Sequence, residues 1–152
     1  MPSFPASAAM AAALAEARAA AARGEVPIGA VVTDASGATL ASASNRTREL
    51  YDPTAHAEIL VIRAAGALLG SERLTGCALH VTLEPCAMCA AAISFARLDR
   101  VYYGAPDPKG GGVDHGARFY QQPTCHHVPQ VYGGIAEAES AALLRDFFAR
   151  RR

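Results

Sequence analysis

Hydrophobic residues recur along this chain with two periods, one typical of helices and one typical of strands. Near the N-terminus, a helical spacing predicts an amphipathic helix whose apolar positions are Met10, Leu14, Ala17 and Ala21. We expect Gly24 to end this helix. Later segments also predict helices, and these are residues 55–69, 86–96 and 137–152.

Two of these later helices have a recognisable boundary or buried face. We expect Thr54 to cap the helix at 55–69 and Gly70 to end it. The residues predicted to face inward from this helix include Ile59, Ile62 and Leu69. Those predicted to face inward from the closing helix are Ala141, Leu144, Phe147 and Phe148.

Short runs of β-branched and apolar residues lie between the helices and predict strands. These runs are residues 26–34, 39–45, 77–83, 100–104 and 127–132. A turn at 35–37 joins the first two runs, which indicates an antiparallel hairpin, whereas the later runs follow helices. We therefore expect an α/β fold with a mixed, about five-stranded sheet that helices cover on both faces.

The composition is that of a globular protein with a single domain. The chain has 152 residues, of which 51% are hydrophobic and 18% are charged. Its 14 basic residues balance its 14 acidic ones, which argues against a protein held to nucleic acid by bulk charge. No signal peptide precedes the four cysteines, and no uncharged stretch is long enough to span a membrane. We expect a reduced, cytoplasmic protein.

Three residues offer ligand atoms for a metal ion. Cys86 and Cys89 are three positions apart, so they share a helix face, and the dipole at the helix start favours their thiolates. His56 lies at the start of the preceding helix, and an α/β sheet can bring successive helix starts to one edge. Three such ligands leave a tetrahedral zinc ion one open position for water, as in catalytic sites.

A carboxylate beside this set points to catalysis. Residues two apart on a helix face different ways, so Glu58 is poorly placed to bind the same ion as His56. It is better placed beside the open position. There it can take a proton from water whose pKa zinc has lowered to roughly 7, and can pass that proton to a leaving group.

The pattern alone leaves other interpretations open. A CxxC pair also occurs in thioredoxin-like redox proteins. A closed structural zinc site, as in a non-catalytic RNA-binding module, would form if a fourth ligand came from Cys77, His80, Cys125, His126 or His127. Cys77 and His80 alternate to opposite faces of a strand, so we expect a core cysteine and a surface histidine. A structural site has no use for Glu58.

Two other segments carry weaker signals. Residues 106–123 contain three consecutive glycines at 110–112 but lack the spacing of a P-loop, so we expect a mobile loop near the site. The arginines at 150–152 are compatible with contact to a nucleic-acid backbone. They are equally compatible with a solvated C-terminus that complements the helix dipole.

His56-Ala57-Glu58 followed by Pro85-Cys86-Ala87-Met88-Cys89 resembles the signature of zinc-dependent nucleobase deaminases. The resemblance covers nearly the whole chain and narrows to bacterial tRNA-specific adenosine deaminases. It is carried by residues 25–31 (EVPIGAV), 52–58 (DPTAHAE), 81–86 (VTLEPC) and 141–148 (AALLRDFF). It implies the three-layer α/β/α fold of cytidine deaminases.

The resemblance also implies roles for individual residues. His56, Cys86 and Cys89 would bind one Zn²⁺ per subunit, and Glu58 would shuttle protons. The residues implied to contact the substrate are Asn45, Ala57 through its backbone, Asp107, Lys109 and Phe148. The chain departs from well-known family members between residues 110 and 131 and lacks a long basic tail beyond Arg152.

The function implied is hydrolytic deamination of adenosine to inosine at the wobble position, 34, of tRNA. The partners implied are a tRNA anticodon stem-loop and a second copy of the chain in a homodimer. An alternative with the same zinc chemistry is deamination of a free nucleobase or nucleoside of the cytosine or guanine type. The metal motif by itself is common to both.

Overall fold

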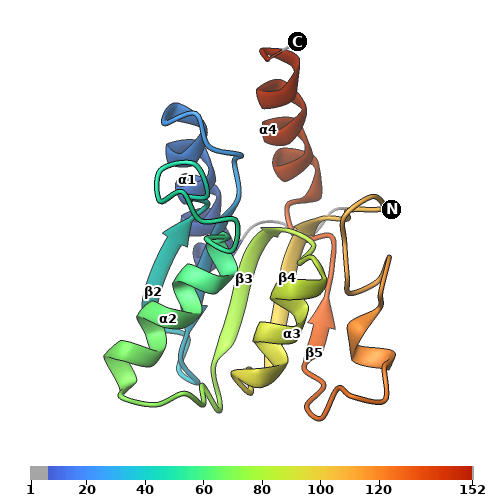
Figure 1. The fold of residues 1–152 in the computed structure, drawn as a ribbon. Helices are drawn as coiled ribbons and strands as arrows, with labels where there is room; N and C mark the ends of the chain where they lie inside the picture. The colour runs from blue at the N-terminus through green and yellow to red at the C-terminus, as the bar shows by residue number, and fades with distance from the viewer. Residues whose placement is uncertain (1–6, 152) are drawn as a thin grey trace.

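The computed structural model describes residues 7–151 and shows a five-stranded sheet between two pairs of helices (Figure 1). The strands are β1 (Gly29–Thr33), β2 (Thr39–Ser44), β3 (Ala78–Leu83), β4 (Arg100–Ala105) and β5 (Gln130–Tyr132). The helices are α1 (Ala8–Ala22), α2 (Ala57–Leu69), α3 (Ala87–Phe95) and α4 (Glu137–Ala149), with a 3₁₀ turn η1 (Phe119–Gln121). The predicted α/β fold is confirmed. The predicted helix end at Arg152 lies outside the described residues.

The sheet is mixed, as predicted. Its strand order is β2-β1-β3-β4-β5. β1 pairs antiparallel with both β2 and β3, whereas β3, β4 and β5 run parallel. The hairpin at residues 35–37 is also confirmed. The parallel strands β3 and β4 are joined through α3, so the carboxyl end of β3 leads directly into a helix start.

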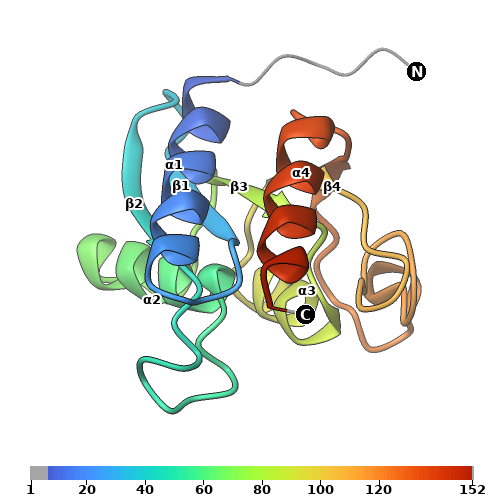
Figure 2. The ribbon, with the colours of Figure 1, turned by 90° about the horizontal axis from the view of Figure 1, so that it is seen from above.

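Helices α2 and α3 cover one face of the sheet, and α1 and α4 lie on the other (Figure 2). β1 is buried along its whole length because helices lie on both of its faces. A Cβ at Gly29 would overlap the Ala13 carbonyl oxygen and the Ala17 nitrogen, so glycine allows α1 to lie directly on β1. No helix between residues 7 and 151 combines the length and apolar character that a membrane crossing demands.

Helix α2 begins later than predicted. Thr54 does not cap it, because its backbone N–H and hydroxyl both donate to the Asp52 carboxylate, at 2.8 and 2.7 Å. His56 occupies the N-cap position instead. Gly70 ends the helix in the left-handed region, with φ of 64°, as predicted.

The buried faces of two helices differ from the predictions. In α2 the buried residues are Ala57, Glu58, Val61 and Ala65, and the predicted core residue Leu69 is 46% exposed. Ile62 is confirmed as a core contact. In α4, Phe147 is buried, but Phe148 is 48% exposed and does not belong to the core. The end of α4 extends beyond the sheet, so it has a face with no layer to pack against (Figure 1).

The two side chains predicted to alternate on β3 are both buried. Cys77 is a core cysteine, as predicted. His80 was predicted to be a surface histidine, and this is wrong, because the ring contacts the Thr33 hydroxyl at 3.1 Å and stacks on Tyr102. The histidine lies on a sheet face that α1 also covers, so strand alternation alone does not bring it to solvent.

Candidate metal centre and active site

The candidate site lies where α2 and α3 begin, at the end of the sheet where β3 has its carboxyl end. His56 is the N-cap residue of α2, and Cys86 is the N-cap residue of α3. Cys89 lies one helical turn further along α3 and is fully buried. Because the two helices lie side by side on one sheet face, their N-terminal ends meet, as the sequence predicted (Figure 1).

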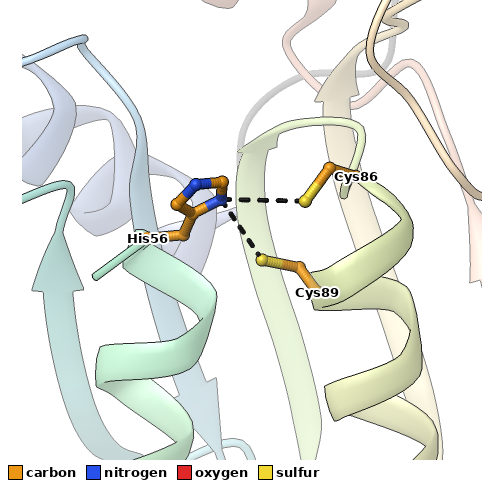
Figure 3. Close-up of side chains that lie close together, drawn as sticks. All are labelled: His56, Cys86 and Cys89. Atoms are coloured by element: carbon orange, nitrogen blue, oxygen red, sulfur yellow. Dashed lines mark hydrogen bonds between the residues drawn. The ribbon is translucent and has the colours of Figure 1, made fainter. Parts of the chain in front are cut away.

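The three side chains converge on one point (Figure 3). His56 Nδ1 lies 3.7 Å from Cys86 Sγ and 3.5 Å from Cys89 Sγ, and all three ligand atoms lie within 4.8 Å of one another. Ideal tetrahedral bonds of roughly 2.3 Å to sulfur and 2.05 Å to nitrogen place such atoms about 3.6 Å apart. The observed separations therefore fit a single zinc ion held by one imidazole and two sulfurs.

Hydrogen bonding makes the sulfurs electronically unequal. The hydrogen bond with Cys89 lowers the pKa of Cys86 to about 4, so Cys86 is a thiolate at neutral pH. The same interaction, together with burial, raises the pKa of Cys89. Hydrogen bonding to Cys86 also raises the pKa of His56, against the effect of burial. A cation is the natural partner of this electron-rich set, since metal ions bind thiolates in place of protons.

Glu58 is buried beside the ligands without being one of them. It is 4% exposed, and its carboxylate oxygens do not belong to the group of three ligand atoms. Glu58 thus lies outside the group of ligand atoms, although His56 precedes α2 and the geometry within a helix does not decide this. Burial raises the pKa of Glu58 to about 7. A carboxyl group with such a pKa can both accept and release a proton near neutral pH.

The described residues offer no fourth protein ligand. Within residues 7–151, the only group of three or more His, Cys, Asp or Glu side chains close enough to share a metal is His56, Cys86 and Cys89. Cys125 instead contacts the Ser94 hydroxyl and the His127 carbonyl oxygen. The arrangement therefore matches an open catalytic site better than a closed structural one.

Comparison with known proteins decides the family. The family described as the cytidine and deoxycytidylate deaminase zinc-binding region matches residues 5–105. The tRNA-specific adenosine deaminase of Agrobacterium fabrum is 64% identical over 140 residues, which cover 92% of this chain and 91% of that protein. The chain belongs to the tRNA-specific adenosine deaminase family.

Solved structures support the same assignment for this deaminase. A structure from a study of A-to-I editing by tRNA:A34 deaminases at the wobble position of transfer RNA has a TM-score of 0.88 and 64% identity. The match covers 90% of this chain and 98% of the chain in that structure. A guanine deaminase from Bacillus subtilis is more distant, with a TM-score of 0.64 and 31% identity over 94% of this chain and 91% of its own.

Asn45 directly follows β2, and Ala57 directly follows His56. Asn45 follows β2 and is 4% exposed, and its backbone is held by a hydrogen bond from its N–H to the Ile28 carbonyl. Ala57 is the first residue of α2, so its N–H has no acceptor within the helix and can serve a bound molecule. Both placements suit the predicted contacts to a substrate.

The loop after β4 reaches the same end of the sheet as the candidate site. It carries Asp107, which is half-buried, and Lys109, which is exposed. Gly112 donates its N–H to the Pro85 carbonyl at 2.8 Å, and a Cβ at this glycine would overlap the Cys86–Ala87 peptide. Gly112 thus lets the loop lie directly on the start of α3, near the site as predicted.

Glu84 anchors this loop, a role that the sequence analysis did not predict. Its side chain is fully buried, and its carboxylate accepts hydrogen bonds from four backbone N–H groups at 3.0–3.2 Å, those of Asp107, Val113, Asp114 and His115. The His115 ring nitrogen contacts it at 2.7 Å. Burial alone would raise the pKa of Glu84, but these hydrogen bonds lower it. Because Glu84 directly precedes Pro85 and Cys86, its carboxylate ties the loop to the segment that carries the two cysteines.

Replacing Glu84 with glutamine is expected to loosen the loop without removing a ligand atom. The amide keeps one acceptor oxygen but loses the charge, so we expect a loss of roughly 1.5–3 kcal/mol in the free energy of unfolding. We also expect KM for RNA to rise several-fold while zinc content stays unchanged. Chemical denaturation, kinetics and metal analysis measure these effects.

The control for this variant is Glu72→Gln, because Glu72 is an exposed glutamate after α2. It should match the wild-type protein in all three measurements. Equal KM values for the Glu84 variant and the wild-type protein would show that the loop does not take part in RNA binding.

Proposed function

We propose that this deaminase converts adenosine to inosine at the wobble position, 34, of a tRNA anticodon, by hydrolysis that depends on bound zinc. The observation that carries the proposal is the three-ligand group with Glu58 buried beside it, in a chain 64% identical to a tRNA-specific adenosine deaminase. An anticodon loop suits a buried site, because its bases are not paired in a duplex and turn outward at little cost.

His56, Cys86 and Cys89 would hold one zinc ion per chain. When bound, zinc supplies an activated water molecule as the nucleophile. The Glu58 carboxylate would take a proton from the attacking water and deliver it to the adenine ring nitrogen N1 as the water oxygen bonds to C6. It would then carry the proton of the new C6 hydroxyl to the amino group as the C6–N bond breaks, so that water and adenosine become inosine and ammonia.

Other residues would position the base. The N–H of Ala57, which follows His56, and the amide of the buried Asn45 would offer hydrogen bonds to the nucleotide. Asp107 and Lys109 lie on the loop that Glu84 holds against α3. Phe148 is exposed on α4 and would offer an aromatic face to the substrate. The single domain would thus contain every group that the reaction needs.

Two copies of the chain would associate through the outer surfaces of α2, α3 and the segment after η1. Large apolar side chains that are 36–74% exposed lie on these elements, and they are Leu68, Leu69, Met88, Phe95 and Val128. Exposed apolar residues on adjacent elements are typical of protein interfaces. A monomeric mass by sedimentation would contradict the proposed homodimer. The cytoplasm, where tRNA is found, is the proposed location.

The experiment that tests the function uses purified, zinc-loaded protein. It is incubated with an anticodon stem-loop that carries adenosine at position 34 and, separately, with free adenosine, guanine and cytosine. Nuclease digestion and chromatography should detect inosine from the stem-loop. Turnover of guanine or cytosine alone would favour the free-base alternative, to which the 31% identical guanine deaminase lends some weight.

A further inference from the structure

The segment between β2 and α2 forms a loop that projects from the body of the molecule near the candidate site (Figure 2). Its neck is closed by a hydrogen bond of 3.0 Å from the Arg46 N–H to the Ala55 carbonyl. The residues on either side of this neck are Asn45 and His56. The loop is therefore rooted directly on the residues assigned to substrate and metal binding.

Hydrogen bonds hold the loop in one conformation. The buried carboxylate of Glu25 accepts the backbone N–H groups of Arg48, at 3.1 Å, and Glu49, at 2.8 Å. Within the loop, Leu50 N–H donates to the Arg46 carbonyl at 3.0 Å. A loop anchored by a buried charge presents its tip in a fixed orientation, which lowers the entropic cost of binding a partner.

The tip presents apolar side chains to solvent. Tyr51 is 96% exposed and Leu50 is 49% exposed. The backbone of Tyr51 lies in the left-handed region, with φ of 50°, an uncommon conformation for a large side chain. An aromatic ring at this position adds almost nothing to the stability of the fold, because almost none of its surface is buried.

Two arginines, Arg23 at the C-cap of α1 and Arg48 in the loop, line the same cleft. A cleft of about 420 Å³ is lined by Arg23, Gly24, Glu25, Arg48 and Glu49. Arg23 is fixed there by hydrogen bonds of its guanidinium to the Ser44 hydroxyl at 2.7 Å and the Asn45 carbonyl at 3.3 Å. Arg46 forms an ion pair with Glu49, whereas Arg23 and Arg48 line the cleft, and the Arg151 guanidinium lies beside Gly24.

The tip is close enough to act on the same RNA strand as the site. Tyr51 is five residues from His56, which limits their separation to about 18 Å even for a fully extended chain. An exposed aromatic ring next to arginines is the combination that binds single-stranded nucleic acid, because every base has a face that stacks and every nucleotide has a phosphate.

We propose that Tyr51 stacks on a nucleobase next to the target adenosine while Arg23 and Arg48 contact the adjoining phosphates. This inference rests on the proposed function, since it assigns the flanking RNA of the same substrate to the loop at residues 46–55. The balanced net charge of the chain is consistent with it, because a ring and two arginines provide local rather than bulk attraction.

The test compares Tyr51→Ala and Tyr51→Phe with the wild-type zinc-loaded protein. The readouts are kcat and KM for the anticodon stem-loop and the Kd of the same RNA by fluorescence anisotropy. Loss of one stacked base is expected to raise KM and Kd about tenfold for the alanine variant. The phenylalanine variant keeps the ring and should stay within about twofold of the wild-type values. Because Tyr51 is exposed, neither variant should change the unfolding temperature.

A matched control is Tyr132→Ala, since Tyr132 is a partly exposed tyrosine on β5, at the sheet edge beyond β4. Its KM and Kd should be those of the wild-type protein. Unchanged Kd and KM in Tyr51→Ala would overturn the inference, as would a variant whose only change is a weaker dimer by sedimentation. If the wild-type protein formed no inosine but Tyr51→Ala still weakened RNA binding, the contact between Tyr51 and RNA would stand and the proposed function would fall.

Discussion

Replacement of Glu58 by glutamine is expected to lower kcat for inosine formation by roughly 10²–10⁴-fold, the usual contribution of a general acid/base. The amide has the size of the carboxyl group but cannot accept a proton from water or carry it to the base. Glu58 is not among the clustered ligand atoms, so the variant should keep its zinc. Burial disfavours the charged carboxylate, so its removal should not destabilise the fold.

Single-turnover kinetics and zinc analysis of the same sample test this prediction. Glu72→Gln, a change of the same chemistry at an exposed glutamate, should retain full activity and full zinc. An active Glu58→Gln variant would show that another group moves the proton. A variant that lost its zinc would show instead that Glu58 supports the metal.

The cluster of His56, Cys86 and Cys89 could be predicted from the sequence because part of its geometry is local. A spacing of three brings Cys86, at the N-cap of α3, and Cys89, in its first turn, to the same side of the helix start. His56 required one further assumption, that α2 and α3 start at the same edge of the sheet. The parallel pairing of β3 with β4 and the position of both helices on one face make this assumption correct.

The buried face of α2 could not be predicted as reliably. The helix is apolar on most of its surface, so several stripes can face the sheet. The structure selects Ala57, Val61 and Ala65, whose small side chains allow close contact with β1 and β2. The larger Leu69 is left exposed. Which side of α2 faces the sheet depends on the shape of the surface formed by β1 and β2, and the sequence of the helix alone does not determine that shape.

The role of Glu84 could not be predicted from the sequence either, because its hydrogen-bond partners lie more than twenty residues away along the chain. A glutamate before a proline carries no local signal for a buried anion that organises a distant loop. Its position directly before the metal-binding segment was the one available indication. Likewise, the apolar character of Leu50 and Tyr51 suggested nothing unusual until the structure showed both side chains in solvent.

Replacement of Cys86 by serine is expected to abolish zinc binding and to lower activity by at least about 10³-fold. A serine hydroxyl does not ionise at neutral pH, whereas the pKa of Cys86 is about 4, so the thiolate that neutralises the cation is lost. Without the metal, the pKa of water returns from roughly 7 to far above neutral, which removes the nucleophile. Zinc content after dialysis against a chelator and the rate of inosine formation measure both losses.

The matched control is Cys125→Ser, because Cys125 is a free cysteine outside the ligand group and lies among hydrogen-bonding partners that accept a hydroxyl. This variant should keep about one zinc per chain and near wild-type activity. A metal bound by His56, Cys86 and Cys89 would cross-link the starts of α2 and α3, so the Cys86 variant alone should unfold at a lower temperature. Loss of zinc from the Cys125 variant, with zinc retained by the Cys86 variant, would place the metal elsewhere.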